Sequence, residues 1–396
     1  MPKRYCKNVN ILDPLLVKTA VLDCLHKGKK RRRRDTVAYF GRMAGVSVQA
    51  AEKMLLQRTP DFFATVDKIV ASLIVEMESR KIKLPNIYHH QRQDKSSGKV
   101  RKISILHIKN LILDHVAVTA LEPVLCRLGA YQVSGLPDRG AQYGARALRR
   151  WLKNKRMKYA VKLDIKDCYG STDRAKLLAW LRLHVKNEPL LWLVSTLVHH
   201  CDRGLSIGSY LSQTLAQLYL SELYHLACKN GKKVLFYMDD MVLLSTNRRH
   251  LRRDVRELVA KAASMGYLIK PNWCIFRVSE TRPLDVMGFR FSRGRVTDRK
   301  RIFRRARRAL MRIGARIRSC RRVPVALAMR LLSYKGWLLF ANCSRFLRRH
   351  NADFVFAVAA KRVSLFSNLT STNQSNHDRQ KPIFRKARRS PLLSQW

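Results

Sequence analysis

The sequence predicts an α+β protein in which a mixed region of strands and helices lies between two helical regions. Over residues 86–290, short apolar runs alternate with helical patterns, which indicates a unit that contains both element types. Residues 1–85 and 291–360 instead show helical periodicity and many cations. Because 46% of the residues are apolar, the chain can bury a substantial core.

Two stretches of the mixed region have the composition of buried strands, namely 158–165 (KYAVKLDI) and 233–244 (KVLFYMDDMVLL). The segment between them, 208–228, has a helical pattern. This order of elements is typical of α/β and α+β units.

The first 85 residues form a predicted helical, basic extension. A run of six cations, Lys29–Arg34, precedes Asp35, a candidate N-cap, and an apolar-periodic stretch. Residues 38–56 loosely resemble a helix-turn-helix, which suggests either a DNA-binding regulator or a small helical bundle that holds structured RNA. The regulator leaves the acidic motifs of the mixed region unexplained. We expect the basic run to be a solvated RNA contact.

Residues 291–360 are predicted to be strongly basic helices. Between Arg293 and Arg322 there are 14 Lys or Arg residues and one Asp. Apolar residues recur on one face at helical spacing: Ile302, Ala306, Leu310, Ile313 and Ile317. The remaining surface is cationic. Residues 361–396 are rich in Ser, Asn, Arg and Lys and are predicted to be disordered.

The charge balance predicts a polyanionic partner. The chain of 396 residues has 80 Lys and Arg against 27 Asp and Glu, a formal net charge of +53. A charge of this size opposes compaction unless a polyanion shares the space. Nucleic acid fits, because each neutralised phosphate releases counterions. Composition alone does not separate an enzyme from a ribosome- or chromatin-binding protein.

Cysteine usage and hydropathy favour a reducing compartment. The nine cysteines include no CxxC pair and no Cys/His spacing that suits zinc. The first ten residues lack the apolar core of a signal peptide, and no stretch reaches the roughly 20 apolar residues of a membrane span. We therefore expect a cytoplasmic protein without a membrane partner.

Two adjacent acids, Asp239 and Asp240, stand between apolar runs of strand type. Burying ionised carboxylates in such a setting is costly unless they are paired or bind a metal. A hairpin whose turn presents both acids to a cation satisfies this requirement. The alternative is an ordinary Asp-containing hairpin turn.

A second acid, Asp164, ends the other apolar strand, with Asp167 and Asp173 as competing candidates. We favour Asp164 because it lies at the strand end. Two strand-borne acids far apart in sequence can converge on two divalent ions, which activate a 3′-hydroxyl and stabilise the leaving pyrophosphate. Mg²⁺ suits such a site because it takes carboxylate, phosphate and water oxygens together.

These residues carry a resemblance to reverse transcriptases over roughly 95–345. Asp164–Tyr169 resembles the first catalytic motif of that family, and Tyr237–Asp240 resembles its metal-binding turn. Between them, Gly204–Ala216 (GLSIGSYLSQTLA) is similar to the motif that lines the nucleotide and template. The order and spacing of the three motifs make coincidence an unsatisfactory explanation.

The resemblance implies a right-hand polymerase with a helical N-terminal extension. Its implied parts are the extension (1–85), the fingers (86–160), the palm with the catalytic acids (161–290), the basic helical thumb (291–360) and the tail (361–396).

The resemblance also implies site roles. Asp164 and Asp239 would bind Mg²⁺, or Mn²⁺ in its place, with Asp240 in support. Tyr169 would exclude a ribose 2′-hydroxyl and so select dNTPs. Further nucleotide-binding residues would be Arg101, Lys102, Arg139, Gly208, Ser212 and Gln213, with phosphate contact in the template or primer as the alternative for the cations. Primer and template contacts would come from Tyr237, Met238, Met287, Gly288, Phe289, Arg304 and Arg308.

Two departures from the family pattern concern Ile207 and Gln213, which stand where most members have Gln and Pro. This variant resembles bacterial reverse transcriptases of diversity-generating retroelements and of phage defence, and it puts copying fidelity in doubt. Trp273 occupies the place of a lysine that protonates pyrophosphate in many members, so Lys270 is a candidate substitute.

The resulting hypothesis is an RNA-directed DNA polymerase that copies a dedicated non-coding RNA in antiviral defence. The alternatives are mutagenic copying by a diversity-generating element, an RNA-directed RNA polymerase, and a non-catalytic nucleic-acid-binding protein. Expected partners are the RNA template, an RNA/DNA duplex and dNTPs. An accessory protein or a second copy of the chain is left open.

Overall fold

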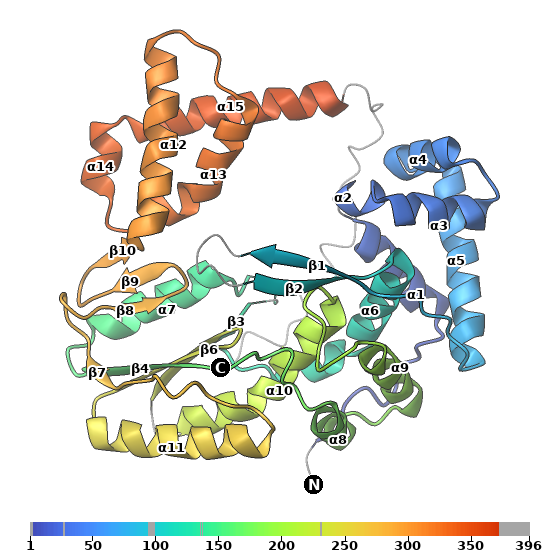
Figure 1. The fold of residues 1–396 in the computed structure, drawn as a ribbon, viewed down its shortest axis with the longest axis horizontal. Coiled ribbons are helices and arrows are strands. Elements are labelled where there is room, and N and C mark those ends of the chain that lie inside the picture. The colour runs from blue at the N-terminus through green and yellow to red at the C-terminus, as the bar shows by residue number, and fades with distance from the viewer. Residues whose placement is uncertain are drawn as a thin grey trace. The chain divides into compact units, whose positions relative to one another are not determined.

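The computed structural model (Figure 1) describes residues 3–26, 28–93, 100–134, 136, 138–229 and 232–371. Its described residues divide into two compact units. The first contains the chain up to Phe303 together with Leu339–Cys343. The second contains Arg304–Leu338 and the described residues from Ser344 onward. The boundary therefore falls after Phe303, later than the predicted start of the thumb at residue 291.

A five-stranded sheet forms the centre of the first unit, in the order β3-β5-β6-β4-β7. Its strands are β3 (Gln132–Val133), β4 (Tyr159–Asp164), β5 (Lys233–Tyr237), β6 (Asp240–Ser245) and β7 (Phe276–Arg277). The predicted strands at 158–165 and 233–244 are thus present, and the second is a hairpin of β5 and β6. All neighbours are antiparallel except β3 and β5.

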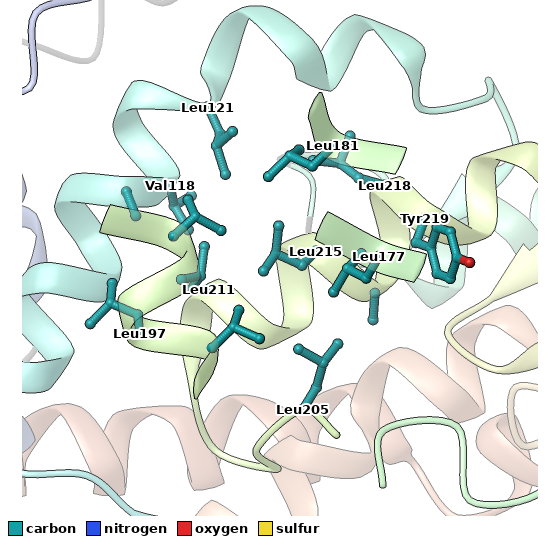
Figure 2. Close-up of a cluster of buried hydrophobic side chains, with 14 of the residues drawn as sticks. Val118, Leu121, Leu177, Leu181, Leu197, Leu205, Leu211, Leu215, Leu218 and Tyr219 are labelled. Carbon is teal, nitrogen blue, oxygen red and sulfur yellow. The ribbon is translucent and has the colours of Figure 1, made fainter. Parts of the chain in front are cut away.

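One face of this sheet is covered by helices that share the main core. Alternate strand residues such as Val161, Leu163 and Leu243 belong to that core. Helices α10 (Tyr210–Cys228) and α11 (Arg248–Ser264) contact the strands, while α8 (Arg174–His184) packs on α10 and α9 (Glu188–His199) packs on α8 in the same core. Figure 2 shows leucines of α10 meeting those of α8 and neighbouring helices in this core. The helix predicted at 208–228 is α10.

The opposite face carries α7 (Ala141–Lys153) and a three-stranded sheet of β8 (Leu284–Val286), β9 (Phe289–Phe291) and β10 (Val296–Asp298). A Cβ atom at Gly144 of α7 would lie 3.0 Å from side chains of Leu235, Met287 and Val133. Glycine therefore allows α7 to approach both the central sheet and the β8–β9 turn closely.

The N-terminal helices are part of the first unit. They are α1 (Pro14–Leu25), α2 (Gly28–Arg31), α3 (Arg34–Ala44), α4 (Val48–Gln57) and α5 (Pro60–Glu78). Helix α1 packs on α6 (Ile108–Ala120), and Tyr5 forms a bridge with Val185 beside α8. The predicted helix-turn-helix outline corresponds to α3 and α4, but their apolar residues join the main core. The extension is therefore not an independent module.

Lys30 and Arg33 of the basic run have structural contacts and are not solvated, whereas Arg32 and Arg34 are exposed and their RNA contact stays a prediction. Arg33 forms a bidentate pair with Asp35 and donates to the Leu106 carbonyl at 2.6 Å. Lys30 lies 3.2 Å from the imidazole of His115. Asp35 is not the N-cap of α3; its carboxylate accepts from the backbone N–H of Ile108, the first residue of α6. These cations join the extension to α6.

The second unit consists of helices α12 (Lys300–Arg318), α13 (Val325–Phe340), α14 (Ser344–Arg349) and α15 (Ala352–Ser371), which include short ends assigned to the first unit. The predicted apolar stripe of α12 is confirmed at Ala306, Leu310 and Ile313, which are buried. Because α15 continues to Ser371, the disorder predicted from residue 361 is wrong for 361–371. The remainder of that predicted tail, 372–396, lies outside the described residues.

Candidate active site

The three predicted metal-binding acids converge where β4 ends and the β5–β6 hairpin turns. Asp164 and Asp240 are direct partners across β4 and β6, and Asp240 also faces Tyr237 across the hairpin. Asp239 occupies the turn, next to Met238, whose φ is +54°. Met238 thus adopts the left-handed conformation that a tight hairpin turn requires. The acids project from strand ends toward the side of the sheet that α10 and α11 do not cover.

The carboxylates repel one another. Burial raises the pKa of Asp239, and the negative charges of Asp240 and Asp164 raise it further. The backbone N–H of Asp239 and the Lys270 ammonium group act in the opposite direction. A site with this much negative charge favours a cation.

Two lysines form ion pairs with Asp164 and Asp240. The Nζ atom of Lys270 forms an ion pair with Asp164, and the Lys270 backbone N–H donates to the Asp164 carbonyl at 2.9 Å. The Nζ atom of Lys162 lies 2.8 Å from Asp240. Lys270 was a candidate from sequence, whereas Lys162 was missed. Its position two residues before Asp164 on a strand was the available signal, because such residues share a sheet face.

The competing acids have other roles. Asp173 is the N-cap of α8 and accepts from the Lys176 N–H at 3.1 Å. Asp167 is exposed, with φ of +48°, and its carboxylate folds over Gly170. A Cβ atom at Gly170 would lie 2.4 Å from that carboxylate. Neither acid faces Asp240 across the sheet, which supports the choice of Asp164.

Tyr169 lies half-buried beside the acid cluster. Burial, with Cys168 and Asp239 as neighbours, raises the pKa of its phenol to about 12. The ring therefore stays neutral and can act by its shape. Its backbone carbonyl accepts from the Leu205 N–H at 2.8 Å, which joins the first acidic motif to the middle motif.

The middle motif approaches two other segments through its glycines. A Cβ atom at Gly204 would lie 2.4 Å from the Tyr169 carbonyl oxygen, and one at Gly208 would lie 2.4 Å from that of Ser104. Both glycines also have positive φ, +52° and +124°. Only glycine allows the backbone of this loop to contact both segments.

Ser104 belongs to a hairpin of β1 (Tyr88–Gln93) and β2 (Val100–Ile105). Its N–H donates to the Ile207 carbonyl at 2.8 Å, so the hairpin is fixed to the middle motif. On the same face of β2, Lys102 lies 3.1 Å from the Asp202 carboxylate, which also contacts His89 at 2.7 Å. Arg101 points to the other face, is exposed and lies opposite Arg92.

Sequence comparison identifies the family to which this arrangement belongs. Residues 93–291, half of the chain, match the family described as reverse transcriptase (RNA-dependent DNA polymerase). The chain is a reverse transcriptase. The chain therefore belongs to this family and has its α+β right-hand polymerase fold.

Solved structures similar to this reverse transcriptase include telomerases of two Candida species. An apo telomerase from Candida tropicalis has a TM-score of 0.41 and 11% identity, and the match covers 54% of each chain. Telomerases bound to a telomeric RNA fragment, from Candida albicans and Candida tropicalis, have TM-scores of 0.41 and 0.46 and identities of 13% and 12%. These matches cover 72% and 83% of this chain but only 60% and 66% of the telomerase chains. No curated protein sequence matches significantly.

The acids of this reverse transcriptase fit a divalent metal, as its family requires. In the described part of the chain, no three acidic, His or Cys groups already form a metal cage. Instead, Asp164 forms an ion pair with Lys270, and Asp240 forms one with Lys162. Three carboxylates on one sheet edge, with the pKa of Asp239 raised by its neighbours, have the donor chemistry that Mg²⁺ and Mn²⁺ prefer.

Three predicted nucleotide-binding residues of the reverse transcriptase have other environments. The Ser212 hydroxyl is buried and accepts from the Ser206 N–H at 3.1 Å, a contact within the middle motif. Arg139 is half-buried and donates to the Gly129 carbonyl at 3.3 Å. Gln213 is half-buried on the first turn of α10. Gly208 acts through its backbone, as described above.

The predicted primer-contacting hairpin is the β8–β9 turn. Met287 and Gly288 have φ of +50° and +81°, the conformation of a type I′ turn. The side chains of Met287 and Phe289 are buried, and Phe289 packs on Phe340 with 4.9 Å between ring centroids. Gly288 is buried as well, so none of the three residues is exposed in this structure, and their contact with a primer stays a prediction.

The predicted thumb cations Arg304 and Arg308 lie one turn apart on α12 and are exposed. They belong to the second compact unit, and their contact with a primer remains a prediction. Within the described residues, no helix is long and apolar enough to cross a membrane.

Proposed function

We propose that this reverse transcriptase copies a dedicated non-coding RNA into cDNA by two-metal nucleotidyl transfer. The observation that carries the proposal is that Asp164, Asp240 and Asp239 lie together at the ends of neighbouring strands, beside Tyr169. Mg²⁺, or Mn²⁺ in its place, would be held by these carboxylates and would activate the 3′-hydroxyl and stabilise the leaving pyrophosphate.

The remaining steps belong to the side chains around the acids. The neutral ring of Tyr169 would close the space at the sugar C2′ position and so exclude a ribose hydroxyl. Arg101 and Lys102 would meet the triphosphate from the fingers hairpin. Because Lys102 is paired with Asp202, that exposed ion pair would open when the triphosphate binds. Lys270, whose ammonium group forms an ion pair with Asp164, would be the candidate to protonate the leaving pyrophosphate.

The test is primer extension on an RNA template with Asp239→Asn and Asp164→Asn variants. Each should lose extension by several orders of magnitude while retaining its fold by circular dichroism. Asp167→Asn is the matched control, because Asp167 is an exposed acid of the same motif, and it should extend normally. Full extension by the Asp239→Asn variant would refute the metal assignment.

For the biological role, we propose antiviral defence, with a diversity-generating element as the alternative. The motif with Ile207 and Gln213 supports this restricted group. Sequencing the nucleic acid that copurifies with the protein tests the dedicated template, and ordinary messenger fragments would count against it. A high error frequency in the cDNA would favour the diversity-generating alternative.

A further inference from the structure

Helix α11 carries an arginine stripe on the back of the central sheet. The stripe consists of Arg248, Arg249, Arg252, Arg253 and Arg256, all of them exposed. Of these, only Arg253 has an acidic partner in the described part of the chain, and its contact with Glu257 is long, at 3.9 Å. The other four cations face solvent without a compensating charge.

This arrangement opposes helix stability. Arg248 and Arg249 lie in the first turn of α11, where the helix dipole disfavours cations. Three pairs of the five arginines are like charges at i,i+4 spacing, which destabilise a helix further. No acid lies in the first turn. The stripe therefore does not stabilise the helix, and binding of a negatively charged ligand is the simpler explanation for it.

The stripe is fixed in orientation by the buried side of α11. Leu251, Val255 and Leu258 lie in the main core. Asp254 forms a buried ion pair with Lys232, at 2.6 Å and with both side chains about 5% exposed or less. These contacts set the rotation of the helix, so that the arginines point away from the sheet.

A basic loop continues the same surface. Met157 lines a cavity of about 80 Å³ together with His250 and Arg253, which places the 153–158 loop beside the start of α11. Exposed cations flank Met157 in that loop: Lys153, Lys155, Arg156 and Lys158. The stripe and the exposed cations of this neighbouring loop are together named the palm-back surface below.

The palm-back surface is separate from the active site. Asp164 and Asp240 project from the face of the sheet opposite to α11, as the alternation of residues along β4 and β6 requires. The stripe starts after Ser245, five residues along β6 from Asp240, a distance of about 17 Å. In Figure 1, α11 lies on one side of the central strands and the β1–β2 hairpin lies on the other.

We propose that the palm-back surface binds the phosphate backbone of double-helical RNA outside the polymerase site. Arginine forks match phosphate oxygens, and unpaired arginines on successive helical turns can follow a phosphate backbone. The exposed face of α11 offers cations and small residues such as Ala260 and Ala263 but no large apolar anchor, which a protein interface would need. RNA is favoured over DNA because the enzyme must already hold an RNA. The choice of RNA over DNA is the only part of the inference that rests on the proposed function.

The experiment measures binding of a blunt RNA duplex while a short RNA/DNA primer–template saturates the polymerase site. The variants are Arg248→Ala/Arg252→Ala/Arg256→Ala and, as the charge-retaining control, the same three positions changed to Lys. The Ala variant should bind the RNA duplex about tenfold more weakly, and the slope of log affinity against log salt should decrease by about 2–3. The Lys control keeps the charge but not the fork, so it should retain the wild-type salt slope and bind more tightly than the Ala variant. Both variants should extend the short primer normally.

Several outcomes would overturn the inference. One is a wild-type protein that cannot bind the duplex once its polymerase site is occupied. Another is an Ala variant that keeps the wild-type affinity and salt slope for the RNA duplex. A wild-type preference for duplex DNA over duplex RNA would also overturn it. So would an Ala variant that binds anionic lipid vesicles more weakly but binds the RNA duplex as the wild type does. Absent primer extension by the wild type would instead refute the proposed function, and the duplex measurement would still be interpretable.

Discussion

Asp164 and Asp240 face each other across β4 and β6, and each is paired with its own lysine. The ion pair between Lys162 and Asp240 implies competition between the ammonium group and a divalent cation for one carboxylate. Lys162→Met should therefore raise the affinity for Mn²⁺ by a factor of about 3–10, measured by electron paramagnetic resonance of free Mn²⁺.

The matched control for this prediction is Lys166→Met. Lys166 is an exposed cation near the same strand and has no ion pair with the acids among the described contacts. It should leave the Mn²⁺ affinity nearly unchanged. If Lys162→Met weakens Mn²⁺ binding, the lysine supports the metal site and does not compete with it.

Tyr169 should determine the choice of sugar. Its ring is half-buried beside the acids and is held neutral by a pKa of about 12. Tyr169→Ala should reduce the preference for dNTPs over NTPs by about 10–100-fold, in the kcat/KM ratio of single-nucleotide extension. Tyr169→Phe keeps the ring and should keep the preference. A large loss with Phe would assign the selectivity to the hydroxyl group.

Gly208 should control the attachment of the fingers hairpin. A Cβ atom there would lie 2.4 Å from the Ser104 carbonyl oxygen, and φ is +124°. Gly208→Ala should therefore destabilise the protein by about 1–3 kcal/mol and raise the KM for dNTP, because the hairpin must move away. Gly140→Ala is the control, since a Cβ atom at Gly140 meets nothing within 4 Å. Equal stabilities of the two variants would contradict the close contact.

Local patterns were sufficient to predict β4, β5, β6, α10, α12 and the acid cluster, but not the other strands. Asp164 and Asp239 follow apolar runs, and burial of charge next to such runs has few solutions. The pairing of Lys162 with Asp240 could also have been predicted. Lys162 lies two residues before Asp164 on the same strand, so the two share a face, and Asp164 faces Asp240. What local patterns miss depends on partners that are distant in sequence. Arg33 of the basic run donates to the Leu106 carbonyl, 73 residues away.

The same reasoning explains the β8–β9 turn and the N-terminal region. The family pattern located the turn at Met287, but it cannot say that α7 buries the Met287 side chain. The helical extension was recognised from its periodicity. Its integration into the main core follows from contacts such as Tyr5 with Val185, which no local pattern encodes.

Asp114 should make stability depend on pH. Its carboxylate is 2% exposed, accepts from the Ser209 hydroxyl at 2.7 Å and from the Tyr210 N–H at 3.0 Å, and so caps the start of α10. Burial raises its pKa to about 6, against the three hydrogen bonds and Lys30, which lower it. Because the folded pKa exceeds the unfolded one, this group contributes stability below pH ~4 that is lost as the pH rises through about 6.

The prediction is tested with Asp114→Asn, whose amide oxygen can accept the same hydrogen bonds without a charge. From pH 4 to 7, the free energy of unfolding of the wild type should fall relative to the variant by up to about 3 kcal/mol, measured by urea denaturation at each pH. Asp114→Ala removes the cap and should be less stable than the Asn variant at every pH, because the Ser209 and Tyr210 donors lose their acceptor. A difference between wild type and Asn variant that does not change with pH would show that folding does not raise the pKa of Asp114.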